Sequence, residues 1–243
     1  MFQIKNTFRI AFVLVWLFAT STQQVYPQQK PINYIAPAVL ITAGFVGVYN
    51  TSFCDFKEDI KQNLADLRGD NYLHFDNYFQ YAPITYFAIG DYIGTPSKHN
   101  INERVLLGCT AAIITFGLTQ GIKSAVGEER PDTKAHTSFP SGHTATAFME
   151  AELVRLSYGN WVGLGAYAVA TGIGFLRMYN ERHWLNDVLG GAGMGILSAN
   201  IAHLLLPWEK SWFKHQKNDD ISLHISPFYG PHNSIGINFV VTM

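Results

Sequence analysis

Four long uncharged segments constrain this chain more than any other feature of its sequence. They occupy residues 31–54, 105–122, 161–176 and 188–208. A bilayer core of about 30 Å is crossed by roughly 20 apolar residues of helix, so most of these segments are long enough to span it. Charged residues make up only 14% of the chain, against about 25% in an ordinary soluble domain. We therefore expect an all-α fold that is largely embedded in a membrane.

Two weaker segments, 78–90 and 142–158, complete a predicted bundle of six helices. The first is short, and the second carries three charged residues: Glu150, Glu152 and Arg155. Such residues are costly in contact with lipid, so we expect them to face protein or an aqueous end. Residues 56–67 have mixed charges and predict an amphipathic helix at the surface.

Both ends of the chain differ from this helical body, which we place at residues 30–208. Residues 1–29 resemble a signal peptide or an N-terminal anchor, because basic residues precede an apolar run. Residues 209–243 begin with a basic stretch and continue with alternating apolar residues on either side of turn residues. This last pattern predicts a small C-terminal β-hairpin.

Composition also excludes some classes of function. The net charge of -1 gives no reason to expect nucleic acid as a partner. The two cysteines, Cys54 and Cys109, have no metal-ligand spacing and indicate no disulfide framework. Cys109 lies inside an apolar run, and we expect it to be a small buried residue.

Two histidines, His183 and His143, have sequence neighbours that could support catalysis by an imidazole. His183 and Asp187 are four residues apart, so on a helix they would share one face. The carboxylate could then fix the tautomer of His183 and make its other nitrogen a nucleophile. His143 follows Ser141 and Gly142, where a helix is predicted to begin with Ser141 as its N-cap. Such a helix start can cradle a phosphate, and His143 could donate a proton there.

Three cations flank these histidine elements: Lys123, Arg130 and Arg177. Arginine binds phosphate oxygens bidentately, whereas lysine acts as a point charge. Anchoring at the membrane edge is the alternative role for Lys123 and Arg177, since each ends an apolar segment. It does not explain why they lie beside both histidines.

Together these residues resemble the three signature motifs of the type 2 phosphatidic acid phosphatase (PAP2) superfamily, which includes bacterial acid phosphatases and vanadium haloperoxidases. The first is Lys123, six residues, then Arg130-Pro131, and the second is Pro140-Ser141-Gly142-His143. The third is Arg177, five residues, His183, three residues, then Asp187. The resemblance implies a PAP2-type bundle and a phosphatase that needs no metal or cofactor.

The resemblance also implies a role for each matching residue. His183 attacks phosphorus and becomes a phosphohistidine, while Asp187 orients it. His143 protonates the leaving alkoxide and then activates water. The phosphate oxygens are bound by Lys123, Arg130, the Ser141 hydroxyl, the Gly142 N–H and Arg177. His136 matches no motif position and is interpreted as structural or as lining the approach to the site.

The expected substrate is a phosphorylated lipid, because apolar segments surround the motifs. Candidates are phosphatidic acid, phosphatidylglycerophosphate, an isoprenyl diphosphate or lipid A. The export leader and a resemblance to envelope phosphatases favour lipid A. The alternative is a soluble periplasmic non-specific acid phosphatase of the same superfamily. A haloperoxidase or a non-catalytic membrane scaffold fits the sequence less well.

We expect a bacterial inner-membrane protein whose active site faces the periplasm. If all six segments span, the loops that carry the motifs share one side. The opposite side then holds Lys98, Lys210, Lys214 and Lys217, and positive loops favour the cytoplasm. A cleaved leader would reverse this arrangement unless one weak segment fails to span.

Overall fold

The computed structural model of the protein describes residues 32–73, 75–133, 135–216, 222–230 and 234–242. The predicted leader at residues 1–29 lies outside these ranges. The helices are α2 (Ile32–Tyr49), α3 (Thr51–Arg68), α4 (Asp76–Phe79), α5 (Ala82–Ile89), the 3₁₀ helix η1 (Gly90–Ile93), α6 (Ile101–Val126), α7 (Gly142–Tyr158), α8 (Asn160–Tyr179) and α9 (Leu185–Gln216). The strands β1 (Ser222–Gly230) and β2 (Ser234–Thr242) pair antiparallel, with Ser222 opposite Thr242.

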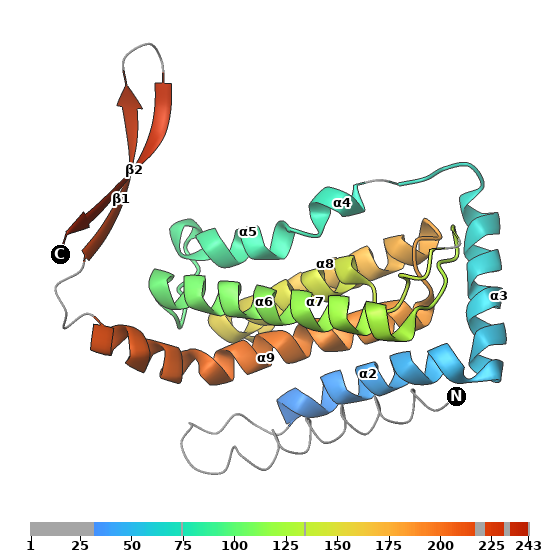
Figure 1. Ribbon diagram of the computed structural model, residues 1–243. Coiled ribbons are helices and arrows are strands. Elements are labelled where there is room, and N and C mark those ends of the chain that lie inside the picture. The colour runs from blue at the N-terminus through green and yellow to red at the C-terminus, as the bar shows by residue number, and fades with distance from the viewer. Residues whose placement is uncertain (1–31, 74, 134, 217–221, 231–233, 243) are drawn as a thin grey trace.

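The long helices lie side by side in a bundle, and α3 stands across one end of it (Figure 1). Helix α9 packs against α2, α6 and α7. Glycines make this close approach possible. A Cβ added at Gly191 would lie 2.6 Å from the carbonyl oxygen of Ser141, and one at Gly193 would lie 2.7 Å from that of Pro37. Small residues at such positions allow helix backbones to touch, which is how helices associate in membranes.

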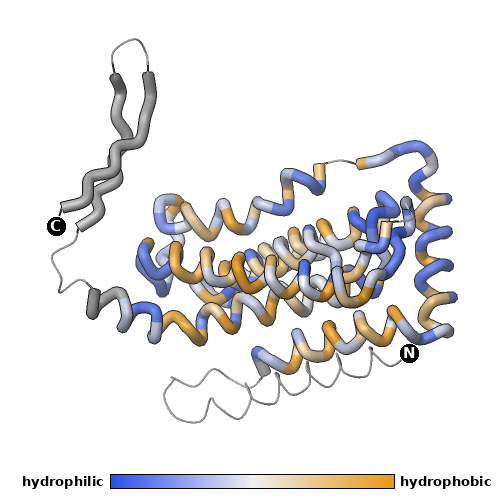
Figure 2. Tube along the Cα trace, in the orientation of Figure 1, coloured by the Kyte–Doolittle hydropathy of each residue, from blue (hydrophilic) through white to orange (hydrophobic). Residues whose placement is uncertain are grey.

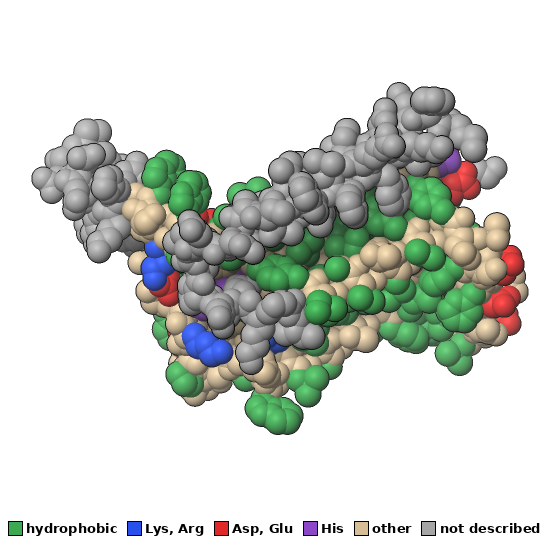
Figure 3. Space-filling view, turned by 90° about the horizontal axis from the view of Figure 1, so that it is seen from below, with side chains coloured by type: hydrophobic (Ala, Val, Ile, Leu, Met, Phe, Trp, Pro, Cys, Tyr) green, Lys and Arg blue, Asp and Glu red, His purple; other side chains and the backbone are tan. Residues whose placement is uncertain are grey.

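Within the described residues, three helical stretches are long and apolar enough to cross a membrane. They are Ile101–Val126, Asn160–Tyr179 and Leu185–Trp212. The weak segments 78–90 and 142–158 are not among them, so six spanning helices are not found. Hydrophobic residues colour the middle of the bundle in Figure 2. On the face seen in Figure 3, charged side chains gather toward its ends. The protein is therefore a membrane protein.

The predicted span 31–54 is not one continuous helix, although α2 and α3 together are apolar enough to count as a fourth, bent span. Helix α2 ends at Tyr49, and α3 begins at Thr51 after a bend of 94°. Asn50 causes the break locally, because its side-chain oxygen accepts a hydrogen bond from the Phe53 N–H at 3.0 Å and so caps α3. Helix α3 contains the predicted amphipathic segment 56–67.

The last helix extends past the predicted end at residue 208. Contacts with α6 hold these extra turns: Lys210 pairs with Glu103, and Thr110 donates a hydrogen bond to Glu209 at 2.7 Å. Polar partners on a neighbouring helix therefore outweigh the loss of apolar character. Cys109, expected to be buried, is exposed, because it lies on an open face of α6.

Helix α7 begins at Gly142 and ends at Tyr158, with Ser141 as its N-cap, as predicted. Its charged residues face protein. The Glu152 carboxylate accepts hydrogen bonds from Arg155 (2.6 and 2.7 Å), from the Tyr167 hydroxyl on α8 (2.7 Å) and from Asn200 on α9 (2.7 Å). This Glu152 cluster joins three helices inside the bundle, with Glu152 only 1% exposed.

Candidate active site

All three predicted motifs meet at the end of the bundle that α3 crosses (Figure 1). Helix α6 ends there, α7 and α9 begin there, and α8 ends there. The connections 127–141 and 180–184 therefore lie together beside α3, and they are hydrophilic in Figure 2. Residues distant in sequence are gathered in one polar region above an apolar bundle.

His183 and Asp187 are in contact, as predicted, although not on one helix. His183 lies in the bend before α9, and Asp187 lies in the first turn of that helix. The His183 Nδ1 atom is 3.2 Å from Asp187 Oδ2, and both side chains are buried. With Nδ1–H donating to the carboxylate, Nε2 keeps a lone pair for attack. Burial and then the positive charges of Arg177, Lys123 and Arg130 hold the pKa of His183 well below its usual value. The ring is therefore neutral, as a nucleophile must be.

Asp187 is itself fixed by several donors. Its Oδ2 accepts hydrogen bonds from the Ser138 hydroxyl at 2.5 Å and from the Trp184 N–H at 2.9 Å. Its backbone carbonyl accepts from the Ser141 N–H at 3.0 Å. The carboxylate that orients His183 is thus tied to the connection that carries the second motif.

Ser141, Gly142 and His143 lie at the start of α7, as predicted. The Ser141 Oγ accepts hydrogen bonds from the Thr144 N–H and hydroxyl, so its own hydrogen remains available to a ligand. A Cβ added at Gly142 would meet no atom within 4 Å, so there is open space beside this backbone. A helix start with free space next to it fits an anion.

Lys123 occupies a different position from that expected. The uncharged segment ends at residue 122, but α6 continues to Val126 and carries Lys123 in its last turn. The Lys123 ammonium donates to the carbonyl oxygens of Thr137, Ser138 and Pro140 at 2.8, 3.2 and 2.6 Å. Lys123 thereby holds the segment that leads into Ser141, and its charge also acts on His183.

The two arginines have donors that no protein group uses. The Nε atoms of Arg130 and Arg177 are buried and have no hydrogen-bond partner among the described residues. Arg177, in the last turn of α8 and not in the link after it, forms an ion pair with Asp76 of α4, at 2.8 Å between Nη1 and Oδ2. Unused guanidinium donors beside two histidines fit the oxygens of a phosphate.

Helix α4 contacts the side chain of His143. Its Nε2 lies 3.2 Å from the side-chain oxygen of Asn77. Burial and the charges of Arg177, His183 and Arg130 lower the pKa of His143 to about 4, against the opposing effect of Asp76. In the substrate-free protein His143 is therefore neutral at pH 7, and a bound phosphate dianion would favour its protonated form.

A buried chain of polar groups connects α3 to this centre. Lys57 pairs with Glu128 at 2.5 Å, and Glu128 accepts from the Asn186 amide at 2.8 Å, next to Asp187. Burial and the Asp187 charge raise the pKa of Glu128 to about 7. Lys57 and Lys61 also lie over the Trp184 ring, 5.2 and 5.1 Å from its centre.

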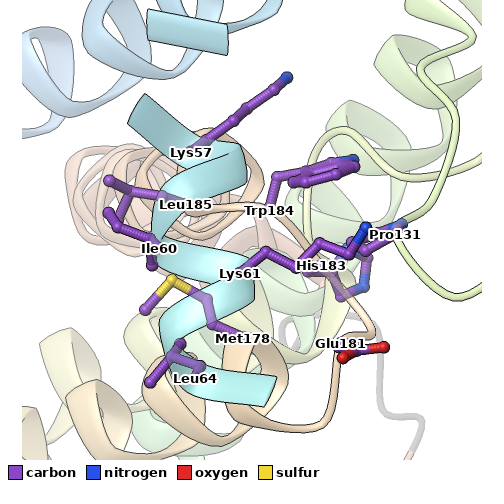
Figure 4. Close-up of a pocket in the computed structure, with 10 residues that line it drawn as sticks. All are labelled: Lys57, Ile60, Lys61, Leu64, Pro131, Met178, Glu181, His183, Trp184 and Leu185. Atoms are coloured by element: carbon purple, nitrogen blue, oxygen red, sulfur yellow. The ribbon is translucent and has the colours of Figure 1, made fainter. Parts of the chain in front are cut away.

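A small pocket opens beside His183, between α3 and the junction of α8 with α9 (Figure 4). Helix α3 lines it with both apolar and basic side chains: Lys57, Ile60, Lys61 and Leu64. Met178 lines it from the end of α8, Glu181 and Trp184 from the connection 180–184, and Leu185 from the start of α9. The space next to His183 is therefore amphiphilic.

Five residues whose side chains contact the site were not predicted from the sequence: Lys57, Asp76, Asn77, Glu128 and Ser138. Asp76 lies 101 residues from its partner Arg177, and Asn77 lies 66 residues from His143. No local spacing relates such pairs. Glu128 lies inside the first motif and Ser138 lies two residues before Pro140, so the positions of these two relative to the motifs could have suggested a role. His136 is exposed, and its Nδ1 lies 3.0 Å from the Gly127 carbonyl oxygen.

The described residues contain no group of three or more His, Cys, Asp or Glu side chains that could hold a metal ion. The carboxylates of the site, Asp76, Glu128 and Asp187, are each paired with side chains of the protein, and the donors that lack a partner among the described residues are the Nε atoms of Arg130 and Arg177. Such donors suit an anionic ligand.

Comparison with known proteins relates this geometry to one family. Residues 104–211 match the family model of the PAP2 superfamily. A lipid A 1-phosphatase of Porphyromonas gingivalis is 33% identical over 192 residues, which are 76% of this chain and 43% of the relative. The chain thus spans less than half of that relative's length.

Two solved structures are also similar. A transmembrane PAP2-type phosphatidylglycerolphosphate phosphatase from Bacillus subtilis has a TM-score of 0.53 and 18% identity, covering 69% of this chain and 94% of that one. Aquifex aeolicus LpxE has a TM-score of 0.45 and 22% identity, covering 58% and 92%. At 18% identity, the similarity to the Bacillus subtilis structure concerns the fold alone.

Proposed function

We propose that the chain is an integral membrane phosphatase of the PAP2 superfamily, whose family model matches residues 104–211, and that it acts on phosphorylated lipids. One observation carries the proposal: a buried neutral imidazole, His183, is tied through Nδ1 to Asp187 at 3.2 Å under the charges of Arg177, Lys123 and Arg130. This arrangement provides a nucleophile together with charge compensation for phosphate oxygens.

In the proposed reaction, Nε2 of His183 attacks phosphorus and a P–N bond forms as the bond to the alkoxide breaks. His143 gives its proton to the departing alkoxide. His143 then takes a proton from water, which attacks the phosphohistidine and releases inorganic phosphate, so that His183 returns to its free state. Asp187 stabilises the positive charge on His183 between the two steps.

The phosphate oxygens are bound by the unused donors of Arg130 and Arg177, the Ser141 hydroxyl and the Gly142 N–H. Lys123 adds positive charge and fixes the connection before Ser141. These groups perform the charge compensation for which other phosphatases use metal ions, so we propose that no metal is required.

For the substrate, we propose the phosphate of lipid A as the first candidate, supported by the 33% identity to the lipid A 1-phosphatase. Phosphatidic acid, phosphatidylglycerophosphate and isoprenyl diphosphates remain in the tested set. The purified protein in detergent with EDTA should release inorganic phosphate from at least one of these lipids. Failure on every one would refute a lipid phosphatase.

The alternative, a soluble periplasmic acid phosphatase, fits the three candidate spans poorly. Carbonate extraction of membranes distinguishes the two, because an integral protein stays in the pellet. Release of the protein into the supernatant would favour the alternative.

We further propose that the site faces the periplasm of a bacterial inner membrane. Support comes from two lysines at the far end of the bundle, since the Lys98 N–H bonds the carbonyl of Ser157 near the end of α7, and Lys210 pairs with Glu103 near the start of α6. Basic residues at that end favour its cytoplasmic placement.

Cysteine labelling tests this orientation. In a Cys54→Ser, Cys109→Ser background, Ala135→Cys should react with a membrane-impermeant thiol reagent in intact cells with a permeabilised outer membrane. Lys98→Cys, at the opposite end, should react only after lysis. The reverse pattern would place the site in the cytoplasm.

A further inference from the structure

The connection between α3 and α5 is bound to the end of α8 by a series of polar contacts. Arg68 donates to the Tyr179 carbonyl at 2.8 Å and pairs with Glu181 at 3.1 Å. The Asn180 side chain both accepts from the Leu73 N–H (3.1 Å) and donates to the Leu73 carbonyl (2.6 Å). These contacts place α4 next to the site.

Two consecutive residues of α4 contact side chains of two different motifs. Asp76, 1% exposed, pairs with Arg177, and Asn77 lies 3.2 Å from Nε2 of His143. A single short element therefore contacts a phosphate-binding cation and the proposed proton donor. Neither contact is needed to close the bundle, because the long helices already pack on one another.

The Asn77 contact determines how His143 holds its proton. With the Asn77 oxygen as acceptor, Nε2 carries a hydrogen, and Nδ1 is left as the atom that gains and loses a proton. The amide is neutral, so it orients the ring without stabilising the cation as a carboxylate would.

We propose that Asp76 and Asn77 are positioning residues of the phosphatase site, with Asn77 orienting the His143 ring and Asp76 orienting the Arg177 guanidinium. This inference rests on the proposed function. It means that α4 sets the orientation of the proton donor, His143, and of one phosphate-binding residue, Arg177. The charged and titratable groups acting on His143 are Arg177 from α8, His183 from the bend before α9, Arg130 from the connection 127–141, and Asp76 from α4 itself.

The test uses the full-length protein in detergent micelles with dioctanoyl phosphatidic acid as the probe substrate. Asn77→Asp places a carboxylate beside His143, and an opposite charge at this distance raises an imidazole pKa by about one unit or more. The limb of the pH–rate profile on which activity falls with rising pH should therefore move up by about one pH unit. Asn77→Ala should lower kcat about tenfold with little change in KM.

Asn71→Asp is the matched control, because it adds the same charge in the same connection, and Asn71 has no side-chain contact with the site. Its pH profile should superimpose on that of the wild type. Asp76→Ala should instead raise KM as well as lower kcat, since Arg177 binds the phosphate before the reaction.

Asn77 is exposed, so its variants should fold, and thermal unfolding in the same detergent verifies this. Unchanged profiles and unchanged kcat in folded Asn77→Asp and Asn77→Ala would overturn the inference, as would an equal shift in Asn71→Asp. A wild-type protein without phosphatase activity on any tested lipid would instead refute the proposed function, so the two failures are distinguishable.

Discussion

Helices α7, α8 and α9 share two buried polar clusters that differ in how their charges are balanced. The Glu152 cluster is nearly complete in itself, because one carboxylate receives donors from Arg155, Tyr167 and Asn200. The cluster at the motif end brings Lys123, Arg130 and Arg177 together, and two of its guanidinium Nε atoms have no partner among the described residues.

A structural cluster and a ligand-binding site can be distinguished by whether each buried charge has a partner within the protein. A buried charge is tolerated when its partners are present, as around Glu152. Arg104, near the start of α6, shows an intermediate case, because its Nε is unpaired while its other nitrogens bind Asp91 and the Phe87 carbonyl. The Arg130 side chain has no such partner in the described part of the chain, which is expected if a ligand supplies it.

The largest expected effect concerns the histidines. His183→Ala and His143→Ala should each lower kcat by roughly 10³-fold or more, because one removes the covalent route and the other the leaving-group proton. Initial rates on the best lipid substrate measure this, with circular dichroism to confirm folding. His136→Ala should retain most activity. A His183→Ala protein with near-normal turnover would disprove the mechanism.

Arg130→Gln should separate activity from stability. Because the Arg130 side chain has no hydrogen-bond or ion-pair partner among the described residues, its removal should leave the unfolding temperature nearly unchanged while kcat/KM falls about 10²-fold. Parallel thermal unfolding and kinetics provide the comparison. A variant that is destabilised but fully active would show that Arg130 serves the fold.

Glu152→Gln should give the opposite result. Loss of the carboxylate leaves Arg155 without its ion pair, and breaking a buried pair costs about 3 kcal/mol. The unfolding temperature in detergent should fall, while the kcat of the protein that remains folded should stay within about twofold. A large loss of kcat at unchanged stability would mean that the Glu152 cluster belongs to the catalytic machinery.

The pH profile should show a moderate effect set by His143. Its pKa is lowered to about 4, so the free enzyme loses the protonated form as pH rises through that value, and kcat/KM should fall from acidic toward neutral pH. A bound phosphate dianion raises the pKa of His143, so kcat should peak at a higher pH than kcat/KM. Coincident optima above pH 8 would contradict this assignment.

Chelation should have the smallest effect of all. If cationic side chains replace a metal, EDTA should change the rate by less than about twofold, and added Mg²⁺ should restore nothing. Phosphate release before and after dialysis against EDTA measures this. If phosphate release depended strictly on a divalent ion, the proposal that arginine donors take the place of a metal would be wrong.

Local patterns in the sequence predicted much of this molecule. The start and end of α7 followed from Ser141 and a change in composition, and the contact of His183 with Asp187 followed from their spacing. The helix ends at Tyr49, Val126 and Gln216 did not. They depend on Asn50 capping the next helix and on contacts such as that of Glu209 with Thr110, which form only in the folded protein.

The motif residues could be proposed from the sequence because each motif is short, and the structure brings the three motifs to one end of the bundle. Their supporting residues could not, since Asp76, Asn77 and Lys57 reach the site from separate elements. Lys123 shows the same limit in another form. The sequence pointed to Lys123, but its hydrogen bonds to three backbone carbonyls depend on the path of the connection 127–141.

The glycine contacts of α9 have a consequence for the order in which the protein matures during synthesis. Gly191 touches the start of α7, and Asp187 receives the Ser141 N–H, so the last long helix completes a centre whose other parts are made much earlier. A nascent chain that ends before residue 187 holds His183 without the carboxylate that contacts its Nδ1 atom. Nearly the whole helical body must therefore be synthesised before the candidate active site can form, and a shorter nascent chain leaves polar groups that the folded protein buries accessible to chaperones and proteases.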